Sequence, residues 1–175
     1  MTEQDMRKAG GGKLSRSETV TVRLDPKLRY LAELAARIHR RTLSSYIEWS
    51  IKQSLDTEPM RPAGWTAEQA DGITIGTQAE NLWDVDEPDR FAKLALRYPH
   101  LLTHEEQVKW KLICENGYLW KGSYRGGEWD WSPDEGKLLL DRLRDNWDLF
   151  CAVANGDKPA SDLPTNTQLY WRVRA

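Results

Sequence analysis

The chain has 175 residues with 25 basic and 27 acidic side chains, giving a net charge of −2. A mean hydropathy of −0.71 and the lack of a long apolar run exclude a membrane-spanning helix. Two cysteines, Cys114 and Cys151, are too few for a disulfide framework or a zinc quartet. Nine tryptophans exclude a wholly disordered chain, because rings of that size require burial.

The charge is unevenly distributed along the chain. Residues 1–57 contain 11 basic and 7 acidic side chains, whereas residues 58–175 contain 14 basic and 20 acidic ones. Residues 1–16 combine consecutive glycines with basic side chains, which is typical of a flexible basic arm, and they contain no apolar core of the kind that a signal peptide has. The distribution predicts a basic working end on an acidic, cytoplasmic body.

Apolar and polar residues alternate over residues 18–25, which predicts a short β-strand with one buried face. The apolar face carries Val20, Val22 and Leu24. The opposite face carries Thr19, Thr21 and Arg23.

Two helices are predicted after the strand. Asp25 and Pro26 are typical of an N-cap and a first helical residue, and Thr42 is suited to cap the second helix. Both helices have apolar residues at helical spacing. In the first these are Leu31, Leu34, Ala35 and Ile38, and in the second Leu43, Ile47, Ile51 and Leu55.

A strand and two helices within about forty residues bury too little surface to fold as a monomer, and an isolated strand leaves its backbone polar groups unpaired. Both problems disappear if two copies pair their strands. Residues 18–55, through the stretches TVTVRLDPKL, LAELA and TLSSYIEWSI, resemble the ribbon-helix-helix family of bacterial DNA-binding repressors, which includes the Arc and methionine repressors. The resemblance covers under a quarter of the chain.

The resemblance implies a homodimer whose two-stranded ribbon lies in the major groove of double-stranded DNA. It assigns base reading to Thr19, Thr21 and Arg23, side chains that can bond to base edges. It assigns phosphate binding to the start of the second helix and the basic residues before it, where free amides and the helix dipole favour an anion. These residues are Arg40, Arg41, Thr42, Leu43 and Ser44.

The family usually has glycine between the two helices, where this chain has His39, Arg40 and Arg41. A non-glycine residue is therefore expected to adopt a left-handed conformation in this turn. The simpler alternatives are that the outward strand residues form an ordinary solvent-exposed face and that the two arginines belong to a solvated turn.

The remainder is predicted to be a Trp-rich α+β domain over residues 65–156, after a proline-containing linker at 58–64 and before a tail at 157–175. Capping motifs begin at Thr66, Thr103 and Ser132, and a further helix is expected from Pro88. The last helix is expected from about Pro133 to Ala154. Residues 117–132 predict a β-hairpin turning at two glycines, and the final LYWRVRA is either a docked strand or a loose tail. The predicted fold class is thus mainly α with a small β component, a ribbon-helix-helix module joined to a helical domain containing a hairpin.

No catalytic constellation is visible in the second part of the sequence, and we expect neither a metal nor a cofactor. His100 and His104 flank a helix start, so exposed turn residues are a better interpretation than metal ligands. The two cysteines are expected to be buried as small apolar residues. The hairpin aromatics are a candidate surface for a protein partner or a small-molecule effector, although packing against the last helix is the favoured alternative. The surface would consist of Trp120, Tyr124, Trp129 and Trp131.

The sequence therefore predicts a non-enzymatic, sequence-specific DNA-binding regulator that acts as a homodimeric repressor in the bacterial cytoplasm, associated with the nucleoid. Further association into a dimer of dimers is left open. The alternative is the antitoxin of a toxin–antitoxin pair, which would bind its own promoter and neutralise a toxin through its C-terminal half. The aromatic C-terminal half, which is expected to fold, favours the repressor, since antitoxin tails are usually short and prone to disorder.

Overall fold

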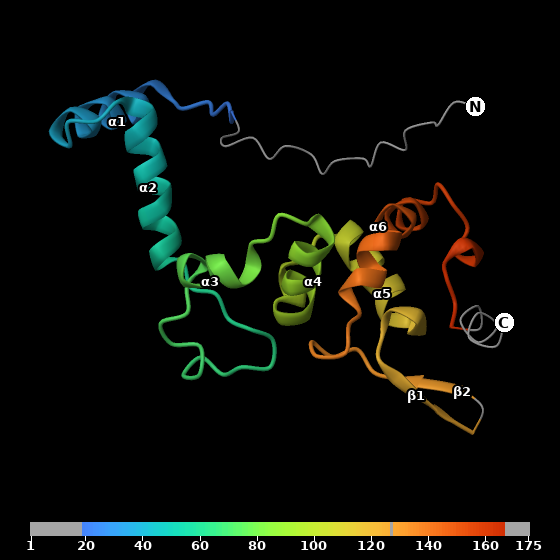
Figure 1. Cartoon of the computed structure of the whole chain (residues 1–175). Helices are drawn as coiled ribbons and strands as arrows, with labels where there is room; N and C mark the ends of the chain where they lie inside the picture. Colours follow the sequence, from blue (N-terminus) through green and yellow to red (C-terminus); the bar gives the residue numbers. More distant parts are fainter. Residues whose placement is uncertain (1–18, 127, 167–175) are drawn as a thin grey trace, which may run out of the picture. The chain divides into compact units, whose positions relative to one another are not determined.

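The computed structural model describes residues 19–126 and 128–166. Over these residues the chain is mainly helical, with one two-stranded antiparallel sheet, as the sequence predicts (Figure 1). The chain divides into two compact units, the first ending at Ser50 and the second beginning at Ile51. The basic arm at 1–16 and the LYWRVRA segment lie outside the described residues.

The two predicted helix starts of the first unit are confirmed. Helix α1 spans Pro26–Ile38, and the Asp25 carboxylate accepts hydrogen bonds from the amides of Lys27 and Leu28, each at 3.0 Å. Helix α2 spans Leu43–Thr57, and its first turn is capped by the Thr42 hydroxyl, which accepts from the Ser45 amide at 3.2 Å.

The strand predicted over residues 18–25 is not formed within the single chain. Residues 19–25 have no regular secondary structure, and residue 18 lies outside the described part. A strand exists only where a neighbouring strand accepts and donates its backbone hydrogen bonds, and among the described residues of the chain no strand pairs with this segment. The strand prediction is therefore not confirmed by the single chain, and its pairing with a second copy stays a prediction.

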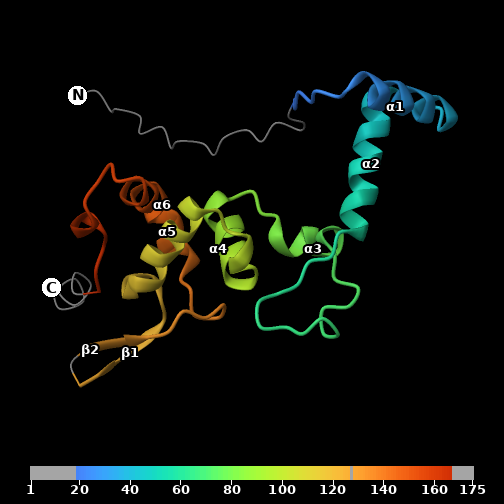
Figure 2. The same ribbon diagram turned by 180° about the vertical axis from the view of Figure 1, so that it is seen from behind.

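The second unit is built on four helices, α3 (Ile75–Leu82), α4 (Glu87–Arg97), α5 (His104–Glu115) and α6 (Leu140–Ala154). Helix α6 lies beside α5 and also packs on α4, as Figure 1 and the reverse view in Figure 2 show. Their inward faces share one apolar core. Its largest members are Phe91, Ile113, Leu119, Trp120, Leu143, Trp147 and Phe150.

Polar contacts fix the ends and the mutual placement of these helices. At the start of α5, Thr103 and Glu106 bond to each other's backbone amide, which confirms the predicted capping box. Asp89 on α4 is only 4% exposed and accepts hydrogen bonds from the Arg144 guanidinium on α6, with Nε at 3.0 Å. Burial of the carboxylate is tolerated because this charge-assisted pair replaces its hydration.

The last helix begins later than predicted. Helix α6 starts at Leu140, and the expected cap Ser132 instead accepts a hydrogen bond from the Lys137 ammonium. Residues 137–139 run antiparallel to residues 119–121, with the Lys121 amide donating to the Lys137 carbonyl and the Leu139 amide to the Leu119 carbonyl, both at 2.8 Å. This backbone pairing across the core outcompetes the local helical signal.

The predicted hairpin is present as β1 (Gly122–Arg125) and β2 (Glu128–Trp131). Tyr124 is opposite Trp129, and Arg125 is opposite Glu128, so the connection consists of the two glycines. Gly126 has φ +62°, a conformation that glycine adopts at little cost.

Residues on either side of the predicted domain 65–156 also belong to the second unit. In the segment expected to be a linker, the Met60 amide donates to the Ile73 carbonyl at 2.9 Å, and the Met60 side chain is buried. Within the predicted tail, Leu163 joins the core and Asn116 donates to the Pro164 carbonyl. No helix over the described residues is long and apolar enough to cross a membrane.

Tyr98, at the end of α4, provides a test of the core. Its ring is fully buried, its hydroxyl has no hydrogen-bond partner among the described residues, and burial raises the pKa of its phenol. Because an unsatisfied buried hydroxyl is unfavourable, Tyr98→Phe should raise the free energy of unfolding by about 1 kcal/mol in urea denaturation. A loss of stability of similar size would mean that the hydroxyl has a partner.

Candidate nucleic-acid interface

The first unit has almost no core of its own. Between residues 19 and 50 only Ala36 is buried, at 3% exposure. Val20 and Ile38 are each 79% exposed and Val22 is 60% exposed, and three side chains on α1 are about half exposed, namely Leu28, Tyr30 and Leu31. Exposed apolar side chains in this number are typical of an interaction surface.

The turn between α1 and α2 has the left-handed residue expected from the sequence. Arg40 has φ +52°, and no other non-glycine among the described residues has a positive φ. The Arg41 amide donates to the Ala36 carbonyl at 2.8 Å, and the Arg40 amide donates to the Arg37 carbonyl at 3.0 Å. These two bonds form a Schellman motif, which terminates α1 and directs the chain into α2.

The N-terminus of α2 has unused hydrogen-bond donors. The Ser45 amide is capped by Thr42, but the amides of Leu43 and Ser44 have no partner within the described residues. Free amides together with the positive end of the helix dipole form a site that favours an anion. Arg40 and Arg41 are both exposed directly before this helix.

An aromatic cluster lies next to the turn. The rings of His39, Tyr46 and Trp49 have centroid separations of 4.8 to 5.7 Å, and the Arg41 guanidinium carbon lies 5.1 Å from the Trp49 ring centroid. We call these four residues the turn cluster. The cluster joins the end of α1 to the first turns of α2 through ring contacts and one cation–π contact.

The three residues expected to read bases are all exposed. The side chains of Thr19, Thr21 and Arg23 are accessible, and Arg23 has no carboxylate partner among the described residues. Val20 and Val22 on the other face are equally accessible, so the single chain does not distinguish the two faces. Only the pairing of two strands would separate an inner from an outer side.

The hairpin aromatics are mostly structural. Trp120 is fully buried and donates to the Ile113 carbonyl at 2.8 Å, so it does not belong to an exposed surface. The Trp131 indole donates to the Cys114 carbonyl in the last turn of α5, and the Trp129 indole donates to the Gly117 carbonyl just after that helix. A β-carbon at Gly117 would lie 2.8 Å from the Trp131 ring, so these rings pack directly on the backbone. Tyr124, at 50% exposure, is the most accessible of the four candidate residues.

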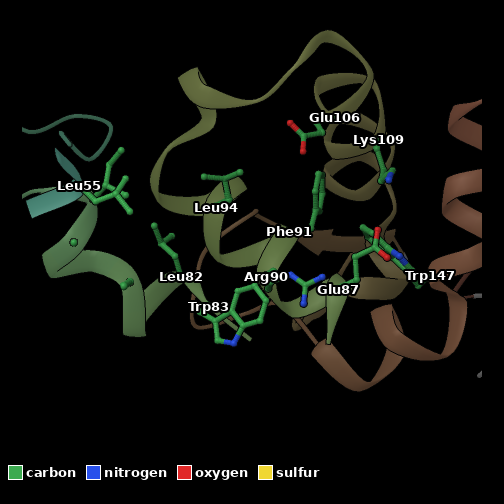
Figure 3. A pocket seen from close by; sticks show the side chains of 13 residues that line it. Leu55, Leu82, Trp83, Glu87, Arg90, Phe91, Leu94, Glu106, Lys109 and Trp147 are labelled. Atoms are coloured by element: carbon green, nitrogen blue, oxygen red, sulfur yellow. The ribbon is translucent and has the colours of Figure 1, made fainter. Parts of the chain in front are cut away.

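An apolar groove of about 630 Å³ opens among the helices of the second unit (Figure 3). Leu82, Leu94 and Phe91 line its apolar part. At its rim, Arg90 lies over Trp83 with its guanidinium carbon 4.8 Å from the ring centroid, and the Lys109 ammonium lies 4.5 Å from the centroid of Trp147. The groove is large enough for a small apolar ligand. Its rim carries the acidic residues Glu87 and Glu106 as well as the two basic ones, so the rim charge does not indicate which class of ligand would bind.

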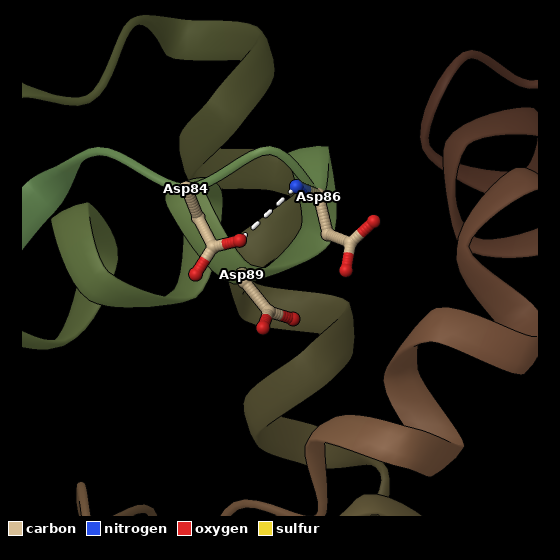
Figure 4. A group of neighbouring side chains, drawn as sticks. All are labelled: Asp84, Asp86 and Asp89. Carbon is tan, nitrogen blue, oxygen red and sulfur yellow. Dashed lines mark hydrogen bonds between the residues drawn. The ribbon is translucent and has the colours of Figure 1, made fainter. Parts of the chain in front are cut away.

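Three carboxylates near the start of α4, those of Asp84, Asp86 and Asp89, have oxygens within 4.8 Å of one another (Figure 4). Each is already close to a cation. Asp84 pairs with Lys93 at 2.7 Å, and this hydrogen bond lowers the pKa of the Asp84 carboxyl. Arg144 pairs with Asp89 and lies 3.8 Å from Asp86. The three carboxylates are thus engaged in ion pairs with side chains of the protein.

The remaining candidates are two histidines and two cysteines. His100 is exposed in the short helix before α5, His104 is exposed at the first residue of α5, and neither is part of a possible metal-binding cluster among the described residues. Cys114 and Cys151 are half-buried against the core, and burial raises the pKa of the Cys114 thiol to about 11. A thiol with this pKa is a poor nucleophile at neutral pH.

Sequence reasoning missed the turn cluster and the groove. The sequence contains a signal for the turn cluster, because Tyr46 and Trp49 are three positions apart on one face of α2 and follow His39 and Arg41 in the turn. The groove has none, since its residues come from separate helices and share no spacing. No family model, curated protein or solved structure matches the chain.

The left-handed Arg40 makes the turn testable. Glycine adopts a positive φ without the steric cost that arginine has. Arg40→Gly should therefore raise the free energy of unfolding by about 1 kcal/mol at fixed protein concentration. The matched control is Arg41→Gly, which removes the same charge at a residue with negative φ and should not stabilise the protein. Stabilisation by both variants would indicate a charge effect and not a conformational one.

Proposed function

We propose that this chain is a sequence-specific DNA-binding transcriptional regulator that acts as a homodimer and represses by occupying a promoter. Two copies pair residues 19–25 as an antiparallel ribbon that enters the major groove, and the N-terminus of each α2 holds a phosphate. The proposal rests chiefly on one observation, that the basic strand–helix–helix segment buries only Ala36 in the single chain.

The dimer follows from the balance of burial and backbone pairing. Val20, Val22 and Ile38 would be covered by the partner copy, and the polar backbone groups of residues 19–25 would be paired across the two-fold axis. Each large apolar side chain that becomes fully buried contributes about 1.5–3 kcal/mol, so several of them per chain would favour a stable dimer.

Charge supports DNA as the partner. Residues 19–50 carry six basic and three acidic side chains, and a dimer doubles this excess. Arg23 offers a guanidinium that can bond bidentately to guanine, while Thr19 and Thr21 offer a hydroxyl and a methyl group. The free amides of Leu43 and Ser44, at the N-terminus of α2, supply a site for a phosphate of the DNA backbone. A repressor that acts by occupying a promoter needs no catalytic step.

A charge on the apolar strand face should abolish the dimer. Val22→Asp would bury two unpaired carboxylates per dimer, which is strongly unfavourable, so sedimentation should give a monomer with less helical signal. Thr21→Asp places the same charge on the opposite face and should leave the dimer intact. A dimeric Val22→Asp protein would contradict the ribbon pairing.

Base reading is tested through Arg23. In titrations against a selected operator and a scrambled duplex, Arg23→Ala should lose about 1–3 kcal/mol per site on the operator and little on the scrambled sequence. Arg29→Ala is a charge-matched control, since Arg29 lies on α1 and pairs with Glu33. Equal operator binding by Arg23→Ala and wild type would show that the ribbon does not read the sequence.

A further inference from the structure

The turn cluster places an arginine on a ring instead of beside a carboxylate. Arg41 lies over Trp49 at 5.1 Å, and within the described residues its guanidinium has neither a carboxylate within 4.0 Å nor a hydrogen-bond acceptor. Arg97, Arg125 and Arg144, by contrast, are paired with acidic side chains. The charge of Arg41 is therefore held in place but not neutralised.

Two other arginines lie over aromatic rings, but their N–H groups also donate hydrogen bonds within the protein. Arg90 lies over Trp83 and donates to the Asp84 carbonyl at 2.6 Å, and Arg142 lies over Tyr118 and donates to the Tyr118 carbonyl at 2.6 Å. Their donors are used within the protein. Arg41 has the same stacking contact with its in-plane N–H donors unused, because a ring contact occupies only the face of the guanidinium.

Arg41 lies at the N-terminus of α2. It directly precedes the Thr42 cap, so its backbone lies at the helix end where the Leu43 and Ser44 amides are unpaired. Side chains on a helix lean toward its N-terminus, which brings the Trp49 ring toward that same end. An ordered guanidinium loses less conformational entropy on binding an anion than a freely rotating one.

We propose that Trp49 is a positioning residue, which holds the Arg41 guanidinium on its ring so that Arg41 and the α2 N-terminal amides bind one DNA phosphate together. This inference rests on the proposed function and adds a residue outside the strand and the turn. The ligand is a phosphodiester oxygen of duplex DNA. Trp49 itself does not contact the DNA.

The contact between the two side chains is tested first without DNA. In the full-length protein, the Arg41 side-chain NMR resonances should be shifted upfield by the Trp49 ring current, and Trp49→Leu should remove this shift. Tyr46→Leu, which removes a ring of the turn cluster that is not under Arg41, should leave the shift in place. Unshifted Arg41 resonances in the wild type would overturn the proposal whether or not the protein binds DNA.

The DNA arm is a double-mutant cycle on the dimeric protein at several salt concentrations. Trp49→Leu should weaken binding to operator and scrambled duplexes alike, about three- to tenfold, and should flatten the salt dependence by up to about two units per dimer. Trp49→Phe, which keeps a ring, should restore most of the affinity. In an Arg41→Ala background, Trp49→Leu should have less than about a twofold effect, because the cation that the ring positions is already absent.

The possible results separate the two claims. If Trp49→Leu weakens binding equally with and without Arg41, Trp49 is only structural and the positioning role is wrong. If the ring-current shift is present but the wild type binds no duplex at any salt concentration, the proposed function fails and the phosphate role fails with it. Tyr46→Leu is the control for general damage to the turn cluster, and its effect should be the same in both backgrounds.

Discussion

The structure depends on one constraint, which is that a strand and two short helices cannot bury their apolar side chains within one chain. Ala36 is the only buried residue between positions 19 and 50, whereas the second unit buries Trp120, Ile113 and Phe150 completely. Helices of this length gain most of their stability from packing and not from intrinsic propensity. The first unit therefore has well-formed caps and a well-formed turn but lacks the surface that would stabilise them. In the proposed dimer a second copy would provide that surface, and the proposed DNA-binding mode depends on it.

The second unit pairs many of its polar groups internally, although the Tyr98 hydroxyl has no partner among the described residues. Its carboxylates near α4 are paired with Lys93 and Arg144, and its hairpin packs on Gly117. Three indole N–H groups, those of Trp120, Trp129 and Trp131, donate to backbone carbonyls. The features that look chemically suggestive in the sequence thus have structural roles. What remains accessible is the apolar groove, whose mixed rim charges do not identify a ligand. Among the described residues, the first unit buries a single side chain before Ile51, whereas the second unit has an apolar core shared by several elements.

Much of the fold was predictable because its signals are local. The Asp25 and Thr42 caps, the Thr103–Glu106 capping box and the diglycine hairpin depend on residues a few positions apart, and all are present. Predictions failed where contacts with residues distant in the sequence determine the local structure. Residues 133–139 have a helical start signal, but residues 137–139 pair with residues 119–121, and α6 begins only at Leu140. Trp120 belongs to an alternating aromatic stretch, yet it precedes the hairpin and is buried under α5.

The candidate site was predicted in part for the same reason. The left-handed turn residue follows from the missing glycine, and Arg40 adopts that conformation. The contact of Arg41 with Trp49 did not follow, because cation–π pairs have no fixed spacing in sequence. The base-reading role of Thr19, Thr21 and Arg23 stays a prediction, because residues 19–25 form no strand in the single chain.

The most direct test of the ribbon is the exchange of backbone amide hydrogens over residues 20–24 in the free full-length protein, measured across a range of concentrations. In an antiparallel ribbon only alternate amides are bonded to the partner strand. The account predicts that alternate amides in this stretch exchange slowly at high protein concentration and become unprotected on dilution below the dissociation constant of the dimer. Exchange of all five amides at the rate of an unstructured peptide, at every concentration, would contradict it.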